Sequence, residues 1–569
     1  MGAVPSLPIY RQVMIEGDEM KTKDTLTQYY KNYLEGTYDC VDRIVLRAYY
    51  PYGVQPGGVR VWWRSLFGND DDLDDTHMMR LAGRFSRRFN GWAKKNNIPV
   101  IECKKGDRKH DMARDYIPDD PEMEGVFAVF VSRATAPVWK VQRSGKKGLF
   151  LYRKKPMPFV KHYSFHIWDR DWGHLTIRMS GHFPWPAMII LNGHEYVSCQ
   201  AKKEAIPFTK VENCFTYFRG TTLNRITETL RSPDAVGCLE EACERWIYQC
   251  LCFGLSFNGQ QLTGFKYHYT VLQMEYSRNL IFKRGKHLDR IFDGIIDRNR
   301  TKLDVSYLKM IFGRRTRPLH RTNKPRLEVM LEKPDYNMTV FKMHFGKLTL
   351  KMYSKGERVL RTEAIVHNTK ALKCRRSLDG FPSIAAELGS YVQHFMESIK
   401  GLDLGFYDQN LLDKLSQPSQ LGKTPIGGIN LNSTRMNAVL KGLMTLAVKP
   451  KGFKSGELAK KISRLMGRTY STSNAAYDIR KLRAKGLVEK IKTTQRYGLT
   501  RKGLPTIVGL ITLKEKIIGP LMASRGRIRK IPNRFLTPID KQYQTLTLEM
   551  AELLKLLQLS PTRRYKPLK

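Results

Sequence analysis

The chain has 569 residues, and its 98 Lys and Arg against 53 Asp and Glu leave a formal net charge of +45. A hydrophobic content of 41% excludes a mainly disordered chain, and no apolar run reaches the roughly 18–20 residues needed to cross a bilayer. The length predicts several domains, and the positive excess predicts a polyanionic partner. Because the basic residues are spread over folded segments and not gathered in one amphipathic helix, we expect nucleic acid as the partner, with no membrane contact and no small-molecule substrate.

The N-terminal part of the chain predicts an arm over 1–35 and a basic α/β domain over 36–150. The first residues lack the basic-then-apolar order of a secretory signal, so a cytoplasmic protein is expected. Five aspartates between 70 and 75 precede a helical stretch at 76–97, where acidic side chains suit the positive end of a helix. We therefore favour a capping role over metal binding. On the wet face of this helix we predict three nucleic-acid contacts: Arg84, Arg87 and Arg88.

An antiparallel sheet with one helix is predicted over 151–260. Alternating polar and apolar residues predict a hairpin from 161 to 180, and Asn192-Gly193 predicts the turn of a second hairpin. The polar face of the first hairpin carries His166 and Arg178, which we predict to contact nucleic acid.

Three acidic residues lie near the predicted turns of these hairpins: Asp169, Asp171 and Glu195. Carboxylates at neighbouring strand ends can hold Mg²⁺ for phosphodiester cleavage, so Mg²⁺ is the cofactor expected if the chain is a nuclease. Asp at a turn usually caps that turn, however, so these residues are weak catalytic candidates, together with Glu363. The nine cysteines include no C-x-x-C pair, which argues against a zinc site and favours reduced thiols.

An α+β domain is predicted over 261–415. A basic loop at 312–326 contributes three predicted nucleic-acid contacts: Arg314, Arg315 and Arg317. Alternation over 347–366 predicts another hairpin, and its lysines are further predicted contacts: Lys347, Lys351 and Lys355. Arg361 and Glu363 share one face of the return strand, where we expect a structural ion pair on a half-buried face.

This hairpin carries Y-x-K-G at Tyr353–Gly356 and L-R-x-E at Leu360–Glu363. The pattern resembles a stretch of plasmid and phage replication initiator proteins. Those initiators cut DNA with a catalytic tyrosine beside a pair of metal-binding histidines, normally His-x-His. The chain departs from the family at that pair, so the resemblance brings no nuclease activity with it, and whether the chain is an enzyme stays open.

The C-terminal part predicts a linker over 416–431, a winged helix-turn-helix domain over 432–523 and a basic tail with a helix over 524–569. Three helical segments precede two short strands, which is the winged-helix order. The stretch Leu482–Gly503 resembles the MarR-like and ArsR-like DNA-binding domains. By that resemblance, the third helix lies in a DNA major groove and the wing lies along the backbone.

The winged-helix segment is strongly basic, with 18 basic and 4 acidic residues between Lys449 and Lys516. On the third helix we predict four contacts to base edges: Ser473, Asn474, Tyr477 and Arg480. Five further residues are predicted to contact phosphate: Lys481, Arg483, Lys485, Lys492 and Arg496. Elsewhere, aromatic residues interleaved with basic ones are candidate stacking platforms for unpaired bases, or else core: Tyr49, Tyr50, Trp62, Trp63, Trp168, Trp172, Phe215, Tyr217 and Phe218.

The sequence therefore predicts a multidomain α+β protein with antiparallel-sheet domains, packed helices and a C-terminal winged helix. Over nearly its whole length the chain resembles a family of uncharacterised basic proteins from bacteria, labelled hypothetical or MarR-like, and no residue roles follow from that resemblance. The favoured hypothesis is the protein component of a ribonucleoprotein or mobile-element system, binding RNA or single strands on sheet surfaces and duplex through the winged helix. Two alternatives remain: a Mg²⁺-dependent nuclease, strand-transfer or replication-initiation protein of a mobile element, and a MarR-like transcription regulator.

Overall fold

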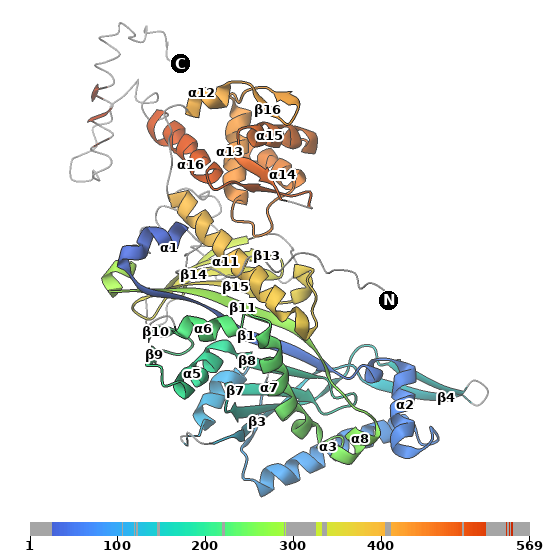
Figure 1. Ribbon diagram of the computed structural model, residues 1–569. Helices are drawn as coiled ribbons and strands as arrows, with labels where there is room; N and C mark the ends of the chain where they lie inside the picture. Colours follow the sequence, from blue (N-terminus) through green and yellow to red (C-terminus); the bar gives the residue numbers. More distant parts are fainter. Residues whose placement is uncertain are drawn as a thin grey trace, which may run out of the picture. The chain divides into compact units, whose positions relative to one another are not determined.

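The computed structural model describes residues 25–104, 106–118, 120, 123–144, 148–218, 222–289, 291, 326–332, 338–403, 411–491, 494–518, 542, 545–546 and 548–549. These residues form an α+β structure, as predicted. They divide into two compact units (Figure 1), the first containing Thr27–Gly294 and Ser306–Gln393 and the second containing His394–Lys569. Most of the predicted arm and nearly all of the predicted tail lie outside the described residues.

Eleven described strands form the central sheet of the first unit, in the order β12-β13-β14-β15-β11-β1-β8-β7-β6-β3-β2. Neighbouring strands are antiparallel except β2 and β3. The predicted domain boundaries at 150 and 260 fall between strands of this one sheet. The strands are β1 (Leu34–Tyr49), β2 (Val100–Glu102), β3 (Gly125–Thr135), β6 (Phe159–Asp169), β7 (Gly173–Ser180), β8 (Ala187–Asn192), β11 (His268–Phe282), β12 (Arg326–Glu332), β13 (Met338–Phe345), β14 (Leu348–Lys355) and β15 (Val359–Val366).

Helices cover this sheet, with α5 and α6 against β1 and α7 against β7 (Figure 1). The helices are α1 (Thr25–Tyr30), α2 (Pro56–Phe67), α3 (Asp75–Lys95), α4 (Lys109–Ala113), α5 (Gly193–Lys203), α6 (Thr222–Thr229), α7 (Asp234–Leu251), α8 (Phe257–Leu262) and α11 (Phe381–Asp403), whose last residues belong to the second unit. The predicted acidic cap is confirmed at α3, where the Asp74 side chain accepts a hydrogen bond from the His77 backbone at 2.7 Å.

The predicted hairpin turn at Asn192-Gly193 is wrong, because a helix begins there. The Asn192 side chain accepts a hydrogen bond from the His194 backbone and caps α5. Asn suits a helix N-cap as well as a tight turn, so the dipeptide alone does not separate the two. Gly193 is required by close packing, since a Cβ there meets the Val41 carbonyl oxygen at 1.8 Å.

Two short hairpins of the first unit lie outside the large sheet: β4 (Trp139–Ser144) with β5 (Gly148–Arg153), and β9 (Phe208–Lys210) with β10 (Phe215–Phe218). β4 and β5 extend beyond α2 at the edge of the unit (Figure 1). No helix among the described residues is long and apolar enough to span a membrane.

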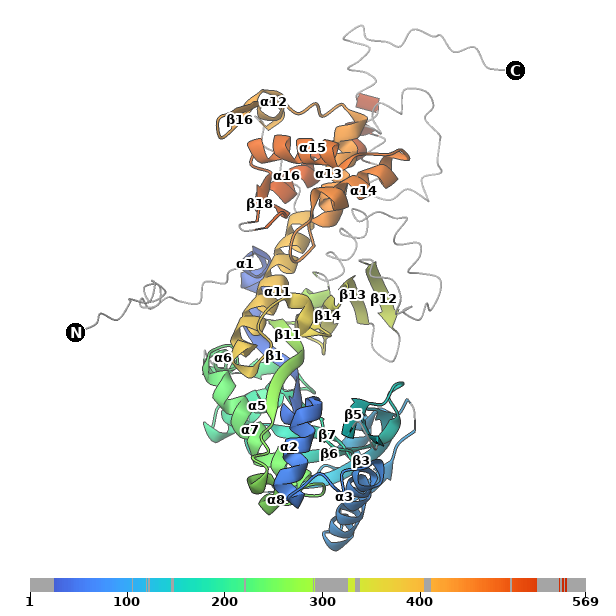
Figure 2. The same ribbon diagram turned by 90° about the vertical axis from the view of Figure 1, so that its right-hand side faces the viewer.

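The second unit follows the predicted order of three helices, two short strands and a helix (Figure 2). Its elements are α12 (Leu411–Ser416), β16 (Ser419–Leu421), β17 (Thr424–Ile426), α13 (Thr434–Leu446), α14 (Ser455–Met466), α15 (Thr472–Ala484), β18 (Val488–Lys490), β19 (Tyr497–Leu499) and α16 (Gly503–Thr512). The segment predicted as a linker forms the β16–β17 hairpin. Leu443, Ile462 and Leu482 join the helices in one apolar core.

Candidate functional sites

Helix α15 separates its polar and apolar residues onto two faces. Ala475, Ile479 and Leu482, which recur at helical spacing, are buried in the core of the second unit. The four residues predicted to reach base edges are all exposed: Ser473, Asn474, Tyr477 and Arg480. The spacing of these four residues places them on one side of the helix, so they form a continuous polar strip beside the exposed Tyr477 ring.

An open groove of about 490 Å³ lies next to this strip, between the first turns of α14 and α15 and the β18–β19 hairpin. Three lysines line it: Lys454, Lys460 and Lys490. Glu457 is the acidic residue of the groove, and its carboxylate is held by Lys449 Nζ at 2.5 Å. Two helix N-termini and three lysines give the groove a positive potential that suits phosphate.

Three of the predicted phosphate contacts have partners inside the second unit. They donate to backbone carbonyl oxygens: Lys481 to Gly428 at 3.2 Å, Lys485 to Lys414 at 2.5 Å and Gln417 at 2.6 Å, and Arg496 to Gly452 at 3.0 Å. The Arg483 guanidinium lies 6.0 Å from the centre of the Tyr497 ring. Lys492, like Arg314, Arg315 and Arg317 of the first unit, lies outside the described residues.

A second candidate site is a buried polar cluster on β1, β11, β14 and β15 of the first unit. Strand pairing places Cys40, Ser277, Glu363 and Lys351 in one row across these strands, and Tyr38, Asn279, Arg361 and Tyr353 in the next. The predicted Arg361–Glu363 ion pair is confirmed at 2.7 Å, and both side chains are buried more deeply than expected. The Tyr353 hydroxyl donates to Glu363 at 2.6 Å.

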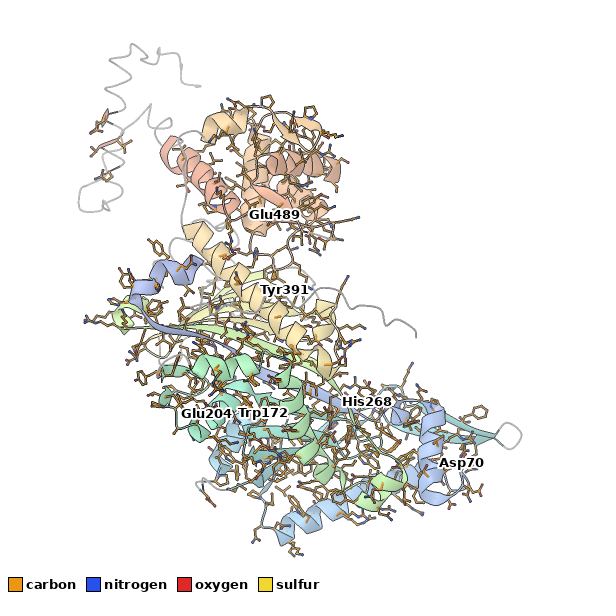
Figure 3. All side chains as sticks on the ribbon, viewed as in Figure 1. Asp70, Trp172, Glu204, His268, Tyr391 and Glu489 are labelled. Atoms are coloured by element: carbon orange, nitrogen blue, oxygen red, sulfur yellow. The ribbon has the colours of Figure 1, made fainter. Side chains whose placement is uncertain are left out.

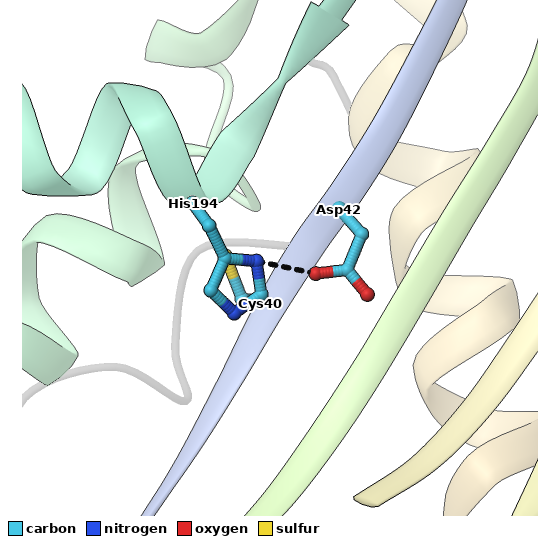
Figure 4. A group of neighbouring side chains, drawn as sticks. All are labelled: Cys40, Asp42 and His194. Atoms are coloured by element: carbon cyan, nitrogen blue, oxygen red, sulfur yellow. Dashed lines mark ion pairs between the residues drawn. The ribbon is translucent and has the colours of Figure 1, made fainter. Parts of the chain in front are cut away.

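Asp42 and His194 complete this cluster from β1 and α5. The Asp42 carboxylate pairs with Arg361 and lies 2.5 Å from Nδ1 of His194 (Figure 4). Burial alone raises the pKa of Asp42, but Arg361 and His194 outweigh it and hold that pKa below its usual value. Burial lowers the pKa of His194, and the neighbouring Asp42 carboxylate opposes that shift. Nε2 of His194 lies 3.2 Å from the Tyr38 hydroxyl oxygen.

Cys40, Asp42 and His194 form a donor set that suits a metal ion. Their sulfur, oxygen and nitrogen atoms lie within 4.8 Å of one another, and all three side chains are buried. Zinc prefers these atom types, although bonds of about 2.0–2.2 Å in a tetrahedral site put nitrogen and oxygen ligands well over 3 Å apart. Because Asp42 and His194 are at 2.5 Å, the set must open before an ion can enter. No local sequence pattern indicates this donor set, because β1 and α5 meet only in the fold.

The three acidic residues predicted near turns are held by cations. Asp169 accepts from Arg245 at 2.6 Å and from Trp246 at 2.7 Å. Asp171 accepts from Arg245 at 2.8 Å, and Glu195, which lies on α5, pairs with a lysine of β9 at 2.6 Å. An arginine or lysine of the protein therefore neutralises the charge of each carboxylate. Glu363, the fourth catalytic candidate, belongs to the polar cluster instead.

The remaining predicted contacts of the first unit differ in exposure. His166 is 1% exposed and its Nδ1 lies 2.9 Å from Nε2 of His174, so no ligand reaches it in this structure. Arg178 is half-buried. Four predicted contacts are exposed: Arg84, Arg87, Arg88 and Lys347. Lys351 and Lys355 are half-buried and pair with Glu363 and Glu212, at 3.5 and 3.4 Å respectively.

Most aromatic residues predicted as stacking platforms are core residues. The structure buries Tyr50, Trp62, Trp63, Trp172 and Phe215 to 2% exposure or less, so of the two interpretations, platform or core, the core one is confirmed for them (Trp172 is labelled in Figure 3). Tyr217 is 40% exposed. The exposed rings that sequence reasoning missed include Phe150 and Tyr152 on β5, whose alternation with buried Leu151 was the available signal.

No protein-family model matches the sequence, and neither does any curated protein. A solved structure titled a rolling circle replication initiator protein from Geobacillus stearothermophilus is matched over 64% of this chain and 83% of that chain. The identity is 8% and the TM-score is 0.18, so this similarity carries no argument about fold or function.

Proposed function

We propose that the chain is a nucleic-acid-binding protein whose second unit binds duplex DNA as a winged helix. The exposed polar strip of α15 carries this proposal. Ser473, Asn474 and Arg480 offer the donors and acceptors that read base edges in a major groove, which is wide enough for one helix. The chain-wide charge of +45 supplies the attraction to phosphate.

The groove beside α15 supports the same geometry. With base edges against α15, the backbone of the duplex passes the first turns of α14 and α15, where Lys454, Lys460 and Lys490 lie. Phosphate contacts fix the register of a protein on DNA, whereas base contacts select the sequence. In this proposal the groove therefore contributes to affinity, and the polar strip of α15 contributes to sequence specificity.

The test is binding to a pool of random duplexes, followed by sequencing of the bound fraction. We expect selection of a short motif by the wild-type protein, and Arg480→Ala should relax the preference at one position at a cost of about 1–3 kcal/mol. Arg501→Ala is the control of equal charge, because that side chain is 75% exposed but lies outside α15. Equal effects of the two substitutions on the selected motif would contradict the proposal.

Two finer alternatives, a ribonucleoprotein component and a transcription regulator, differ in the nucleic acid that the protein binds in its host. We expect a single defined RNA to co-purify with a ribonucleoprotein component, and a promoter fragment to co-purify with a transcription regulator. Sequencing of the bound nucleic acid, after purification without nuclease, makes that measurement.

A second candidate function, strand cleavage in a mobile element, rests on the pair of Tyr353 and Glu363. The carboxylate oxygen is 2.6 Å from the phenolic oxygen and can accept its proton. The pKa of Glu275, next to this pair on β11, is raised to about 7 by burial and by the carboxylates of Glu363 and Asp42. A half-buried hydroxyl that donates to a carboxylate suits a tyrosine nucleophile, and Arg361, which pairs with both Glu363 and Asp42, supplies positive charge beside it.

In such a reaction the Tyr353 oxygen attacks phosphorus and transfers its proton to Glu363, while the leaving oxygen takes a proton from water. The pKa of Tyr353 is raised well above its usual value, first by burial and then by Glu363, so the hydroxyl is protonated until that transfer. The test is covalent attachment of labelled single-stranded DNA in the presence of Mg²⁺. We expect Tyr353→Phe to abolish the adduct and Tyr217→Phe, a control on β10, to retain it.

A further inference from the structure

The β4–β5 hairpin presents two faces of different chemistry. One face is anchored to the first unit: Trp139, Val141 and Leu151 are 4%, 8% and 8% exposed, and the Trp139 indole donates to the Gly53 carbonyl oxygen at 3.0 Å. Arginines flank this buried face, and Arg153 donates to the Val54 carbonyl oxygen at 2.9 Å. The hairpin is therefore held in place by packing and by hydrogen bonds to backbone.

Arg143 anchors the other end of the buried face. It donates to the carbonyl oxygens of Asp70 and Asp71, which follow α2 (Asp70 is labelled in Figure 3). The body of the unit thus fixes the orientation of both strands, and the opposite face of the hairpin must point to solvent.

The outward face carries two aromatic rings and their polar neighbours. Strand pairing sets Tyr152 opposite Lys140 and Phe150 opposite Gln142. The two rings are 43% and 46% exposed, and the Lys140 ammonium lies 5.9 Å from the centre of the Tyr152 ring. We call this face, defined by these four residues, the hairpin platform.

The chain segment that contains the platform has no acidic residue, although Asp75 of α3 contacts the hairpin at the backbone of Val141, 2.8 Å away, and at Lys154, 3.8 Å away. Between Gly125 and Trp168 there is no Asp or Glu, while nine residues are Lys or Arg. A surface of this kind attracts a polyanion and leaves exposed rings free to stack on planar groups. An acidic peptide matches the charge but not the rings, whereas a nucleic-acid strand matches both.

We propose that the hairpin platform binds an unpaired nucleic-acid strand by stacking bases on Phe150 and Tyr152. This inference rests on the proposed nucleic-acid function and names a second ligand class for it. Residues two apart on a strand are about 6.8 Å from each other, twice the 3.4 Å rise per nucleotide of a stacked duplex strand. The two rings therefore suit successive bases of an extended strand, and in a duplex the base faces are already covered by their neighbours.

The experiment measures binding of the full chain to labelled single-stranded RNA, single-stranded DNA and duplex DNA by fluorescence anisotropy. We expect Phe150→Ala/Tyr152→Ala to weaken single-strand binding about thirtyfold or more, because each ring stacks one base, and to leave duplex binding unchanged. Phe150→Tyr/Tyr152→Phe keeps both rings and should keep the affinity. Phe257→Ala, which removes a 62% exposed ring from α8 of the same unit, is the matched control.

The outcomes separate this inference from the function on which it rests. Duplex binding by the wild-type protein without single-strand binding overturns the platform and leaves the proposed function standing, whereas no binding to any of the three ligands overturns both. Single-strand binding that survives removal of both rings also overturns the platform. Comparison of the RNA and DNA affinities then identifies which unpaired strand the platform prefers.

Discussion

Arg361 on β15 pairs with Asp42 on β1, across the intervening strand β11 and over 319 positions of the chain. Both side chains are fully buried, and Arg361 also holds Glu363. Arg361→Met removes the shared cation of two buried carboxylates and leaves Glu363 paired with Lys351, 3.5 Å away. We expect a loss of about 3–5 kcal/mol of folding free energy, measured by urea denaturation.

Two variants control this prediction. Asp42→Asn/Arg361→Met also removes the charge of the Asp42 carboxylate and should recover part of the lost folding free energy. Arg375 and Asp379 form a comparable pair at 2.8 Å, but their side chains are 77% and 54% exposed. Arg375→Met is therefore expected to change stability by less than about 1 kcal/mol, and equal losses from the two arginines would contradict the argument.

This cluster shows which part of a site a sequence can predict. Arg361 and Glu363 are two residues apart on one strand, so alternation alone placed them on one face. Asp42 and His194 joined them only through the pairing of distant strands and the packing of α5, which no local pattern encodes. The helices of the second unit were predictable because Ser433 and Ser471 cap α13 and α15 immediately before apolar residues at helical spacing.

The buried histidines of β6 and β7 predict a dependence of stability on pH. Burial, then His174, His110 and Lys109, lowers the pKa of His166 to about 3, and burial, then His110, lowers that of His174 to about 3. Unfolded histidines take up protons near pH 6.5, whereas the folded ones stay neutral. Folding stability should therefore hold above about pH 6.5 and fall by up to about 1.4 kcal/mol per pH unit for each ring as the pH drops toward 3.

His166→Phe isolates this effect. The ring lies against Phe127 and Phe130, so an apolar replacement suits the site and removes one titrating group. We expect a shallower fall in stability between pH 6 and 5, read from urea denaturation at each pH, whatever the change at pH 7. His268→Gln, at an exposed position labelled in Figure 3, should retain the wild-type slope. A slope unchanged by His166→Phe would contradict the assignment.

Lys485, at the end of α15, is used to test whether its side chain stabilises the fold or contacts DNA. Its ammonium donates to the carbonyl oxygens of Lys414 and Gln417, and burial lowers its pKa. We expect Lys485→Met to lower the melting temperature of the second unit and to leave the salt dependence of duplex binding unchanged. Lys490→Met, which removes a lysine from the groove, should lower the log–log salt slope by about 0.9. The reverse pattern would assign Lys485 to phosphate.

The last prediction compares two glycines, Gly193 at the start of α5 and Gly91 in α3. The sequence alone does not show that their surroundings differ. A Cβ on Gly193 meets the Val41 carbonyl oxygen at 1.8 Å, so Gly193→Ala must push α5 away from β1. We expect a loss of at least about 1–3 kcal/mol in urea denaturation, the usual range for overpacking. Gly91, in the C-terminal part of α3, has nothing within 4 Å of its added Cβ, and Gly91→Ala should stabilise the protein by about 0.5–1 kcal/mol through helix propensity. Because α5 carries His194, the displaced helix also moves the imidazole from Asp42, so Gly193→Ala should weaken the polar cluster while Gly91→Ala leaves it intact. Equal losses of folding free energy in Gly193→Ala and Gly91→Ala would contradict the close contact between α5 and β1.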